Sequence, residues 1–302
     1  MSNATHSIDR TGLFMGAGAY LCWGLLPLYF KAVKSVPAVE VLANRICWAL
    51  VLLLAITFIT RRTDKLRAVF TSWRVVAMLG LSALLICLNW LTYIWAVQNS
   101  HVLEASLGYF LNPLINVLLG MIFLGERLNR VQSFAVALAA AGVAVLAAGA
   151  AAGLWISLTL ALSFGFYGLV RKMAPVQSLE GLAVEAMLLL PIASGYLIWS
   201  AAVGTIAFGS SVSITVLLVL LGAVTAAPLL LFNAAARRLR YSTLGLLQYL
   251  APTLQFLLAV LAFGEAMTTP HIICFALIWT GLIIYAGDGL RNARRMRPAP
   301  AE

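Results

Sequence analysis

Hydrophobic residues occur in this chain as long runs with few polar positions between them. A run of about 20 apolar residues can cross the ~30 Å hydrocarbon core of a bilayer as one α-helix. Ten such runs lie at 12–33, 38–60, 75–97, 103–124, 131–149, 152–170, 181–202, 212–235, 241–263 and 271–289. The pattern therefore predicts an all-α polytopic membrane protein with ten transmembrane helices.

The second half of the chain repeats the first. The segment LGYFLNPLINVLLGMIFLGE at 107–126 returns as LLQYLAPTLQFLLAVLAFGE at 246–265, without a gap and at an offset of 139. Pro113 and Pro252 stay in register, as does the Gly-Glu pair that ends each segment. Duplicated hydrophobic halves with prolines at corresponding positions are typical of secondary transporters.

The repeat extends to other spans, since Gly24 matches Gly165 at an offset of 141 and Glu40 matches Glu180 at 140. Each half holds five predicted spans, an odd number, so the two halves enter the membrane in opposite senses. We expect inverted five-helix repeats at 12–149 and 150–290. A cytoplasmic segment at 1–11 precedes them and a basic cytoplasmic tail at 291–302 follows.

Basic residues lie almost entirely on one side of this topology. With a cytoplasmic N-terminus, 17 of the 20 Lys and Arg fall in inside segments, and only Lys31, Lys34 and Arg45 lie at or near the first outside loop. The positive-inside rule then predicts that both termini are cytoplasmic. Topology thus explains the net charge of +10. Nucleic acid is not an expected partner, and the basic loops suit anionic lipid headgroups.

Composition narrows the function further. Charged residues make up 10% of the chain, against about 25% in a soluble domain. The sequence contains no Gly-rich phosphate loop and no metal-ligand spacing, and its four cysteines are isolated within spans. We therefore expect no metal, cofactor or catalytic residue, and transport that is secondary rather than ATP-driven.

Amide and phenol side chains within the spans are candidates for a substrate cavity. Asn112 and Asn116 lie four residues apart on the helical face of Tyr109. Gln248 and Gln255 lie seven apart, on one face of the ninth span. Inverted-repeat transporters bind substrate near the midplane, where both groups fall. The alternative is hydrogen bonding between helices.

Further candidates for the cavity are Asn89, Tyr93 and Asn233. Pro113 and Pro252 are predicted helix breaks, because proline in a helix interior frees a backbone carbonyl. Trp23 and Trp90 are expected to pack within the bundle or to anchor it at the interface.

Two charged residues lie deep within predicted spans. Arg45 is about seven residues into the second span, and its repeat counterpart at an offset of 140 is Glu185. An unpaired charge at this depth costs roughly 2–3 kcal/mol on insertion scales, so partners are expected. Inversion places the two at opposite depths, which argues against a direct pair.

We therefore expect two separate charged clusters that act as gates. The outer cluster would join Arg45 to Glu104, with Lys31 and His101 nearby. The inner one would join Glu185 to Arg237 or Arg240, with Lys172 nearby. The alternative is static pairs that only hold helices in register. Glu185 is also a candidate to carry a coupling proton.

Glu126 and Glu265 each follow a glycine at the end of a span. Their expected role is to cap or orient the next helix. Their symmetry reflects the duplication and is not evidence for a site.

The segments AYLCWGLLPLYFK, NWLTYIWAVQNSHVLEASLGYFLNPLINVLLGMIFLGERL and TLGLLQYLAPTLQFLLAVLAFGE resemble the RarD branch of the EamA-type transporters, in the drug/metabolite transporter superfamily. The resemblance covers essentially all of 12–290. It implies a ten-helix permease of the bacterial inner membrane and favours export over uptake. It supplies neither a substrate nor residue roles.

The sequence thus predicts a secondary transporter of small organic metabolites or drug-like solutes, working by alternating access between inverted repeats. Spans 1–4 and 6–9 would line the site, with spans 5 and 10 as an outer scaffold. The alternatives are a flippase-like transporter of a lipid-linked metabolite, a non-transporting sensor or subunit, and a membrane-embedded enzyme. The enzyme would need converging catalytic groups, and only Glu104 with His101 offers any. Coupling ion and oligomeric state stay open.

Overall fold

The structure is a computed structural model. It describes residues 10–124, 130–149, 153–236, 238 and 247–295. Within these ranges some helical side chains are not described, among them those of Pro113, Asn116, Lys172 and Asn233. Arg237, Arg240 and Glu126 lie outside the described residues, so the roles predicted for them stay predictions.

Helices make up almost all of the described chain. In order they are α1 (Arg10–Ala32), α2 (Ala38–Ile59), α3 (Thr63–Val69), α4 (Trp73–Gln98), α5 (Val102–Leu124), α6 (Arg130–Gly149), α7 (Leu154–Met173), α8 (Ser178–Ala202), α9 (Val212–Ala236), α11 (Leu250–Leu257), the π-helix η2 (Leu258–Ala262) and α12 (Thr269–Arg295). A helix overlaps each predicted apolar run. The described part of the ninth run begins with a turn before α11.

Six of these helices are long and apolar enough to cross a bilayer: α1, α2, α4, α8, α9 and the part of α7 from Leu154 to Arg171. Three further segments, Ser133–Ala148, Leu250–Ala262 and Thr269–Ile284, are apolar but shorter. With the all-helical fold, these segments show a polytopic membrane protein.

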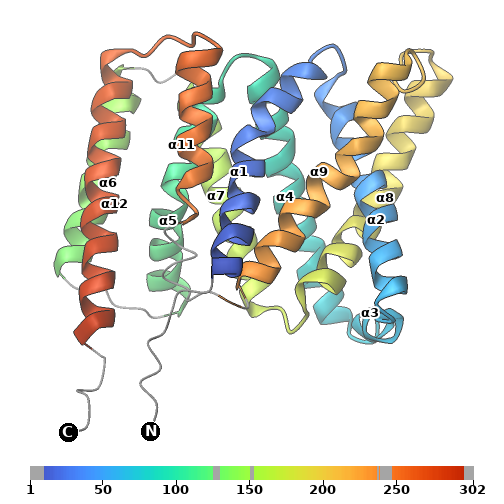
Figure 1. The fold of residues 1–302 in the computed structure, drawn as a ribbon, viewed down its shortest axis with the longest axis horizontal. Coiled ribbons are helices and arrows are strands. Elements are labelled where there is room, and N and C mark those ends of the chain that lie inside the picture. The colour runs from blue at the N-terminus through green and yellow to red at the C-terminus, as the bar shows by residue number, and fades with distance from the viewer. Residues whose placement is uncertain (1–9, 125–129, 150–152, 237, 239–246, 296–302) are drawn as a thin grey trace, which may run out of the picture.

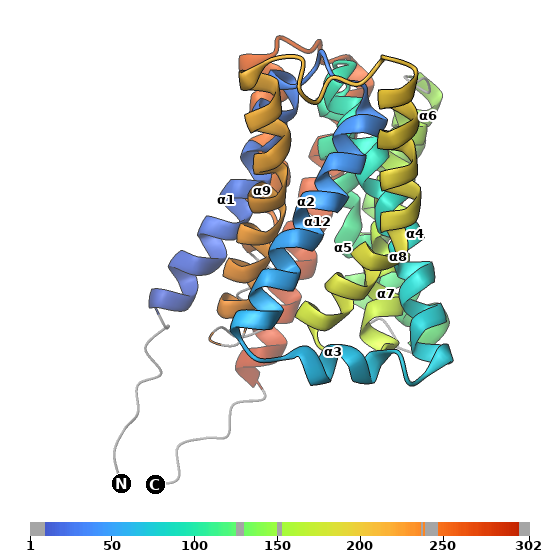
Figure 2. The same cartoon turned by 90° about the vertical axis from the view of Figure 1, so that its right-hand side faces the viewer.

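The long helices stand side by side and run alternately up and down (Figure 1). The beginning of α1, the end of α12 and the short helix α3 lie at the same end of the bundle. Helix α3, which the hydrophobic pattern did not predict, lies across that end, roughly perpendicular to the long helices (Figure 2). We call this the α3 end and the other the opposite end.

Each helix of one half packs mainly on helices of the other half. Helix α6 packs on α12, α5 on α7 and α11, α4 on α7 and α8, α2 on α8 and α9, and α1 on α9 and α11. Helices α6 and α12 stand together at one side of the bundle, away from α2 and α8 (Figure 1). The two halves are therefore interleaved, and the functional groups lie between them.

Glycines allow the closest helix contacts. On α6, a Cβ at Gly142 would lie 3.0 Å from the carbonyl oxygen of Cys274, and on α12 a Cβ at Gly281 would lie 2.7 Å from that of Ala135. Side chains at these positions would push α6 and α12 apart. The offset of 139 relates Gly142 to Gly281 and Ala135 to Cys274, so the two contacts are equivalent in the repeat.

The prolines predicted to break helices behave differently from one another. Helix α5 continues through Pro113, so the chain is not interrupted there. Pro252 lies in the first turn of α11, directly after a turn at Gln248 and Tyr249. Proline is tolerated in a first turn because its missing N–H has no partner within the helix.

Candidate functional site

One face of α4 carries several of the polar groups in the bundle interior. Ser82, Asn89 and Tyr93 are buried on it, and Trp90 is partly buried. The spacing of these positions places them on one side of the helix. At 1.5 Å per residue, Ser82 and Trp90 are separated by about 12 Å along the axis. Helix α4 thus presents polar contacts at two depths.

Arg45 on α2 occupies the level farther from the α3 end. Its side chain is 6% exposed. Its guanidinium carbon lies 4.1 Å from the ring centre of Trp90 and 6.0 Å from that of Phe30. Stacking of a guanidinium on an aromatic face is worth up to about 2 kcal/mol when desolvated. Arg45 is therefore held by aromatic rings.

Arg45 does not form the predicted pair with Glu104. Among the described residues no carboxylate comes within 4.0 Å of it, and its Nε has no hydrogen-bond partner. Sequence spacing predicts that Arg45 and Glu104 lie at similar depths, but it does not predict the direction of their side chains. Arg45 points to α4, and Glu104 contacts His101. A buried guanidinium without a counter-ion is costly and is suited to an anionic or strongly polar ligand.

Two tyrosines and one amide lie beside Arg45. The rings of Tyr93 and Tyr109 are 5.4 Å apart. Tyr109 donates a hydrogen bond to Asn89 Oδ1 at 3.3 Å, and Asn89 Nδ2 donates to the Leu160 carbonyl of α7 at 2.9 Å. The hydroxyl of Tyr93 is buried and has no partner among the described residues. The structure thus brings together three of the predicted cavity residues.

Of the other described amides, Asn112 lies on α5, Gln255 on α11 and Gln248 in the turn before α11. Gln255 Nε2 donates to the Trp23 carbonyl of α1 at 3.1 Å, a contact between helices. Gln255 Oε1 and Asn112 Oδ1 are buried without partners among the described residues. Gln248 is half-buried. In the described part of the chain, Gln255 and Asn89 therefore hold helices together through one amide nitrogen each.

Glu185 on α8 occupies the level nearer the α3 end and is 2% exposed. Ser82 donates to its Oε1 at 2.6 Å, and the Tyr167 hydroxyl lies 3.5 Å from its Oε2. Arg171 Nη1 of α7 is 3.5 Å from Oε1. The prediction named Arg237, Arg240 and Lys172 as partners but missed Arg171.

The contact with Arg171 depends on a glycine. The Arg171 guanidinium occupies the space that a side chain at Gly181 would take. A signal in the sequence could have predicted the pair of Arg171 and Glu185. Arg171 lies near the end of one span, and Gly181 lies four residues before Glu185 in the next.

A narrow cavity of about 20 Å³ connects the two levels. Glu185, Trp90 and Thr225 border it, and the remaining wall is apolar; its other lining residues are Ile46, Ala49, Leu53, Ile86, Leu182, Ala186, Leu189 and Leu229. It can hold a water molecule but not an organic solute. The four helices that line it are α2, α4, α8 and α9, and this conformation is closed at its centre.

A second charged group lies at the end of the bundle opposite α3. Lys31 donates to Ser100 Oγ at 2.9 Å, and its ammonium lies 5.0 Å from the ring centre of Phe263. His101 Nδ1 is 3.4 Å from Glu104 Oε1. The predicted grouping of Lys31, His101 and Glu104 therefore exists, without Arg45.

Glu265 also belongs to this end. It accepts hydrogen bonds from the backbone N–H groups of Val102 (3.0 Å) and Leu103 (2.7 Å). Glu265 therefore caps α5, in the other half of the chain. The sequence had predicted instead that it caps or orients the next helix. Burial raises the pKa of its carboxyl, and the two hydrogen bonds oppose that rise. Gly264 has φ +66°, a conformation that favours glycine and turns the chain toward α5.

The two glutamates that begin α2 and α8 have different surroundings. Glu40 accepts hydrogen bonds at 2.9–3.1 Å from the backbone N–H groups of Ala207 and Phe208, in the α8–α9 connection. Among the described residues, its repeat counterpart Glu180 has only Arg62 as a partner, with Nη1 3.5 Å from Oε1. In the described part of the chain, Glu40 thus binds backbone N–H groups of a connection, whereas Glu180 does not.

Comparisons with known proteins identify the family to which the chain belongs. The model of the EamA-like transporter family matches residues 10–148. Protein RarD of Escherichia coli (strain K12) is 46% identical over 294 residues, which cover 95% of this chain and 97% of RarD. RarD of Streptomyces exfoliatus is 46% identical over 290 residues, covering 96% and 92%. The chain belongs to the EamA-like transporter family.

Within the EamA-like family, the RarD proteins define the branch. A solved crystal structure with 23% sequence identity aligns over 92% of this chain and 98% of its own, with a TM-score of 0.61. This likeness supports the fold alone. An EamA-like transporter acts in a membrane, and the apolar helices agree with a multi-pass bacterial membrane protein.

Proposed function

We propose that this protein is a secondary transporter that exports small organic solutes across the bacterial inner membrane. It would alternate access to a central site between two inverted five-helix repeats, 12–149 and 150–290. Both termini would be cytoplasmic, which places the α3 end inside. The basic segments at 61–74 and 291–297 support this orientation through the positive-inside rule.

The packing of the helices supports the inverted repeat. If α1, α2, α4, α5 and α6 are exchanged with α7, α8, α9, α11 and α12, every main pair between the halves maps onto another main pair or onto itself. For example, α4–α7 becomes α9–α1, whereas α6–α12 is unchanged. Such invariance is expected for halves related by a two-fold axis in the membrane plane.

The glycine contacts between α6 and α12 support the same symmetry at the level of single residues. An offset of 139 carries Gly142 to Gly281 and Ala135 to Cys274, so each contact is the repeat equivalent of the other. This helix pair would be the outer scaffold on which the remaining helices rock.

The proposed function rests mainly on the surroundings of the Arg45 side chain. Its guanidinium is buried on aromatic rings, without a carboxylate within 4.0 Å among the described residues. Its repeat counterpart Glu185 lies about 12 Å farther along α4. We infer that Arg45 receives an acidic or polar group of the solute, with Tyr93 and Tyr109 beside it. The Tyr93 hydroxyl, which has no partner in the part of the chain that the structure describes, is available for such a ligand.

The closed centre implies that the solute enters only when the helices move. At the opposite end, Glu40 ties α2 to the α8–α9 connection and Glu265 ties the α11–α12 connection to α5. At the α3 end, the equivalent carboxylate of Glu180 makes one long contact. We propose that Lys31, His101, Glu104 and Glu265 form the outer gate. Lys172, Glu180, Arg237 and Arg240 would form the inner one.

Glu185 is proposed to carry the coupling proton. It is a buried carboxyl that borders the narrow cavity, and Ser82, Tyr167 and Arg171 hold it in place. Buried acidic groups at membrane depth are typical of proton relays. Protonation would release Arg171 from Glu185 and so change the contact between α7 and α8.

An untargeted profile of small molecules, inside cells and in the medium, tests this proposal. It would compare cells that make the native chain with cells that make an Arg45→Ala/Glu185→Ala variant at matched membrane levels. We expect a class of organic solutes enriched in the medium only with the native chain. Enrichment inside the cells would reverse the direction, and identical profiles would contradict transport through these residues.

A further inference from the structure

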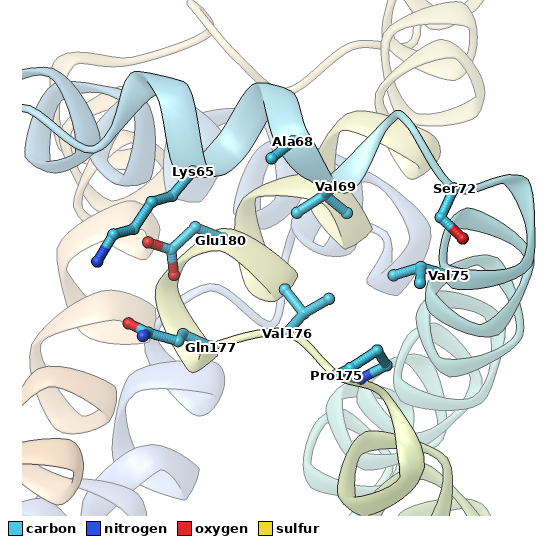
Figure 3. Close-up of a pocket in the computed structure, with 9 residues that line it drawn as sticks. All are labelled: Lys65, Ala68, Val69, Ser72, Val75, Pro175, Val176, Gln177 and Glu180. Carbon is cyan, nitrogen blue, oxygen red and sulfur yellow. The ribbon is translucent and has the colours of Figure 1, made fainter.

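A pocket of about 260 Å³ lies at the α3 end, between α3, the start of α4 and the α7–α8 connection (Figure 3). It is separate from the narrow central cavity and shares no residue with it. The lining residues are Lys65, Ala68, Val69, Ser72, Val75, Pro175, Val176, Gln177 and Glu180. Its size suits a small polar group rather than a large solute.

The pocket contains a buried carboxylate, one oxygen of which lacks a donor among the described residues. Glu180 is 2% exposed, and its Oε2 has no hydrogen-bond partner among the described residues. In the described part of the chain, its Oε1 has only the long hydrogen bond from Arg62 Nη1. The counterpart Glu40 accepts three backbone hydrogen bonds. A charged oxygen buried without a donor is costly, so the pocket is suited to a ligand that donates hydrogen bonds to Glu180.

Cations and apolar side chains complete the pocket. The polar ends of Lys65 and Gln177 gather with the Glu180 carboxylate at one side, and Val69, Val75 and Val176 line the other (Figure 3). Arg62 reaches the same side, where its Nη1 donates to Gln177 Oε1 at 3.0 Å. The pocket thus offers one acceptor for a cationic group beside two cations for an anionic group, next to an apolar wall.

The residues around the pocket are of the kinds that proteins place at a membrane surface. Helix α3 lies across the end of the bundle (Figure 2). The segment that runs from the end of α2 through α3 to the start of α4 carries Arg61, Arg67 and Arg74, as well as exposed Phe70 (49%) and Trp73 (75%). Aromatic side chains among basic ones mark the level of lipid headgroups. A ligand with a polar head and an apolar body can therefore reach the pocket from the bilayer.

We propose that this pocket binds the phosphoethanolamine headgroup of a phospholipid. The ammonium group donates hydrogen bonds to Glu180 Oε2, and the phosphate lies against Lys65 and Arg62. The glycerol backbone follows the apolar wall of Val69 and Val75. An anionic headgroup without an amine leaves Glu180 unpaired, and a choline headgroup has no N–H to donate. The pocket therefore selects the primary amine.

Binding of lipids to the purified full-length protein in detergent tests this, with native mass spectrometry as the readout. The lipids are a phosphatidylethanolamine, its N-methyl and N,N-dimethyl forms, the phosphatidylcholine and a phosphatidylglycerol, all with the same acyl chains. We expect affinity to fall with each methyl group, by about tenfold from the primary amine to choline, because charge-assisted hydrogen bonds are lost. This series changes the ligand and leaves the protein intact.

Two variants assign the effect to the pocket. Glu180→Gln is expected to remove the preference for the primary amine. Asp64→Asn, the same charge change at an exposed position of α3 outside the pocket, is expected to keep it. Equal affinity along the series, strongest binding of phosphatidylglycerol, or an unchanged preference in Glu180→Gln would each overturn the proposal. So would millimolar soluble phosphoethanolamine that binds as tightly as the lipid.

Discussion

Gly24 on α1 lies directly against Leu254 on α11, so that a Cβ at Gly24 would come within 2.7 Å of Leu254 Cδ1. The equivalent contact in the other half joins Gly165 on α7 to Ile115 on α5, where a Cβ would lie 2.5 Å from Ile115 Cγ2. Gly24 corresponds to Gly165 and Leu254 to Ile115 in the repeat. The two halves thus use the same close approach of two helices.

Replacing Gly24 by alanine should separate α1 from α11. We expect a loss of roughly 1–3 kcal/mol from overpacking, seen as a lower midpoint of thermal unfolding in detergent. The double variant Gly24→Ala/Leu254→Ala should recover only the part of that loss caused by Leu254 Cδ1, since Leu254 Cβ, 2.8 Å from the new methyl group, remains.

Gly168→Ala on α7 is the matched control, because nothing lies within 4 Å of a Cβ at that position. Its midpoint should stay at the native value or rise slightly, since alanine favours the helix. Equal destabilisation by Gly24→Ala and Gly168→Ala would show that the close contact is unimportant.

Arg45→Ala should reduce export of the solute identified by profiling by at least about tenfold, since one charge-assisted hydrogen bond is worth 1.5–3 kcal/mol. Arg45→Lys should recover little, because an ammonium does not stack on Trp90 as a planar guanidinium does. Initial rates in vesicles at matched protein levels give the comparison. Arg74→Ala, at an exposed site, is the control; full activity of Arg45→Ala would remove this residue from the site.

Glu185→Gln should uncouple transport from the proton gradient. The amide keeps an acceptor for Ser82 but carries no proton that can be released at physiological pH. Initial rates in vesicles, with and without a pH gradient, should differ for the native chain and coincide for the variant. A variant that retains the full pH dependence would contradict the role given to Glu185.

Glu40→Ala should destabilise the protein by about 1–3 kcal/mol, because buried N–H groups of the α8–α9 connection lose their acceptor. Hydrogen exchange at Ala207 and Phe208 should speed up, while exchange in α6 and α12 stays unchanged. Unaltered protection at 207–208 would mean that this connection is held by other contacts.

Sequence patterns predicted the helices well because membrane spans are set by length and apolarity alone. The predicted range 38–60 and the observed helix Ala38–Ile59 differ by one residue. Helix α3 was missed, since its seven residues carry no long apolar run. Tyr109, Asn89 and Tyr93 were predicted as cavity residues because each is polar within a span, but the sequence did not predict that they lie together.

The partners of the charges could not be predicted in the same way. Spacing along a helix gives the depth of Arg45 and Glu185 but not the neighbour that each side chain faces. Arg45 meets Trp90, an aromatic partner that no charge count reveals. Glu185 meets Arg171 across the gap left at Gly181. Such contacts depend on how helices rotate against one another, which the repeat does not specify.

The separation of Arg45 from Glu185 along α4 has an electrical consequence. In the proposed orientation the positive charge lies toward the outside and the negative charge toward the cytoplasm, against the inside-negative voltage of a bacterial membrane. One elementary charge that crosses the whole field changes energy by about 2.3 kcal/mol per 100 mV. Any movement of Arg45 toward the cytoplasm is therefore assisted by that voltage, and its return is opposed equally, so the voltage favours the state in which Arg45 is displaced inward without adding net charge to a complete cycle.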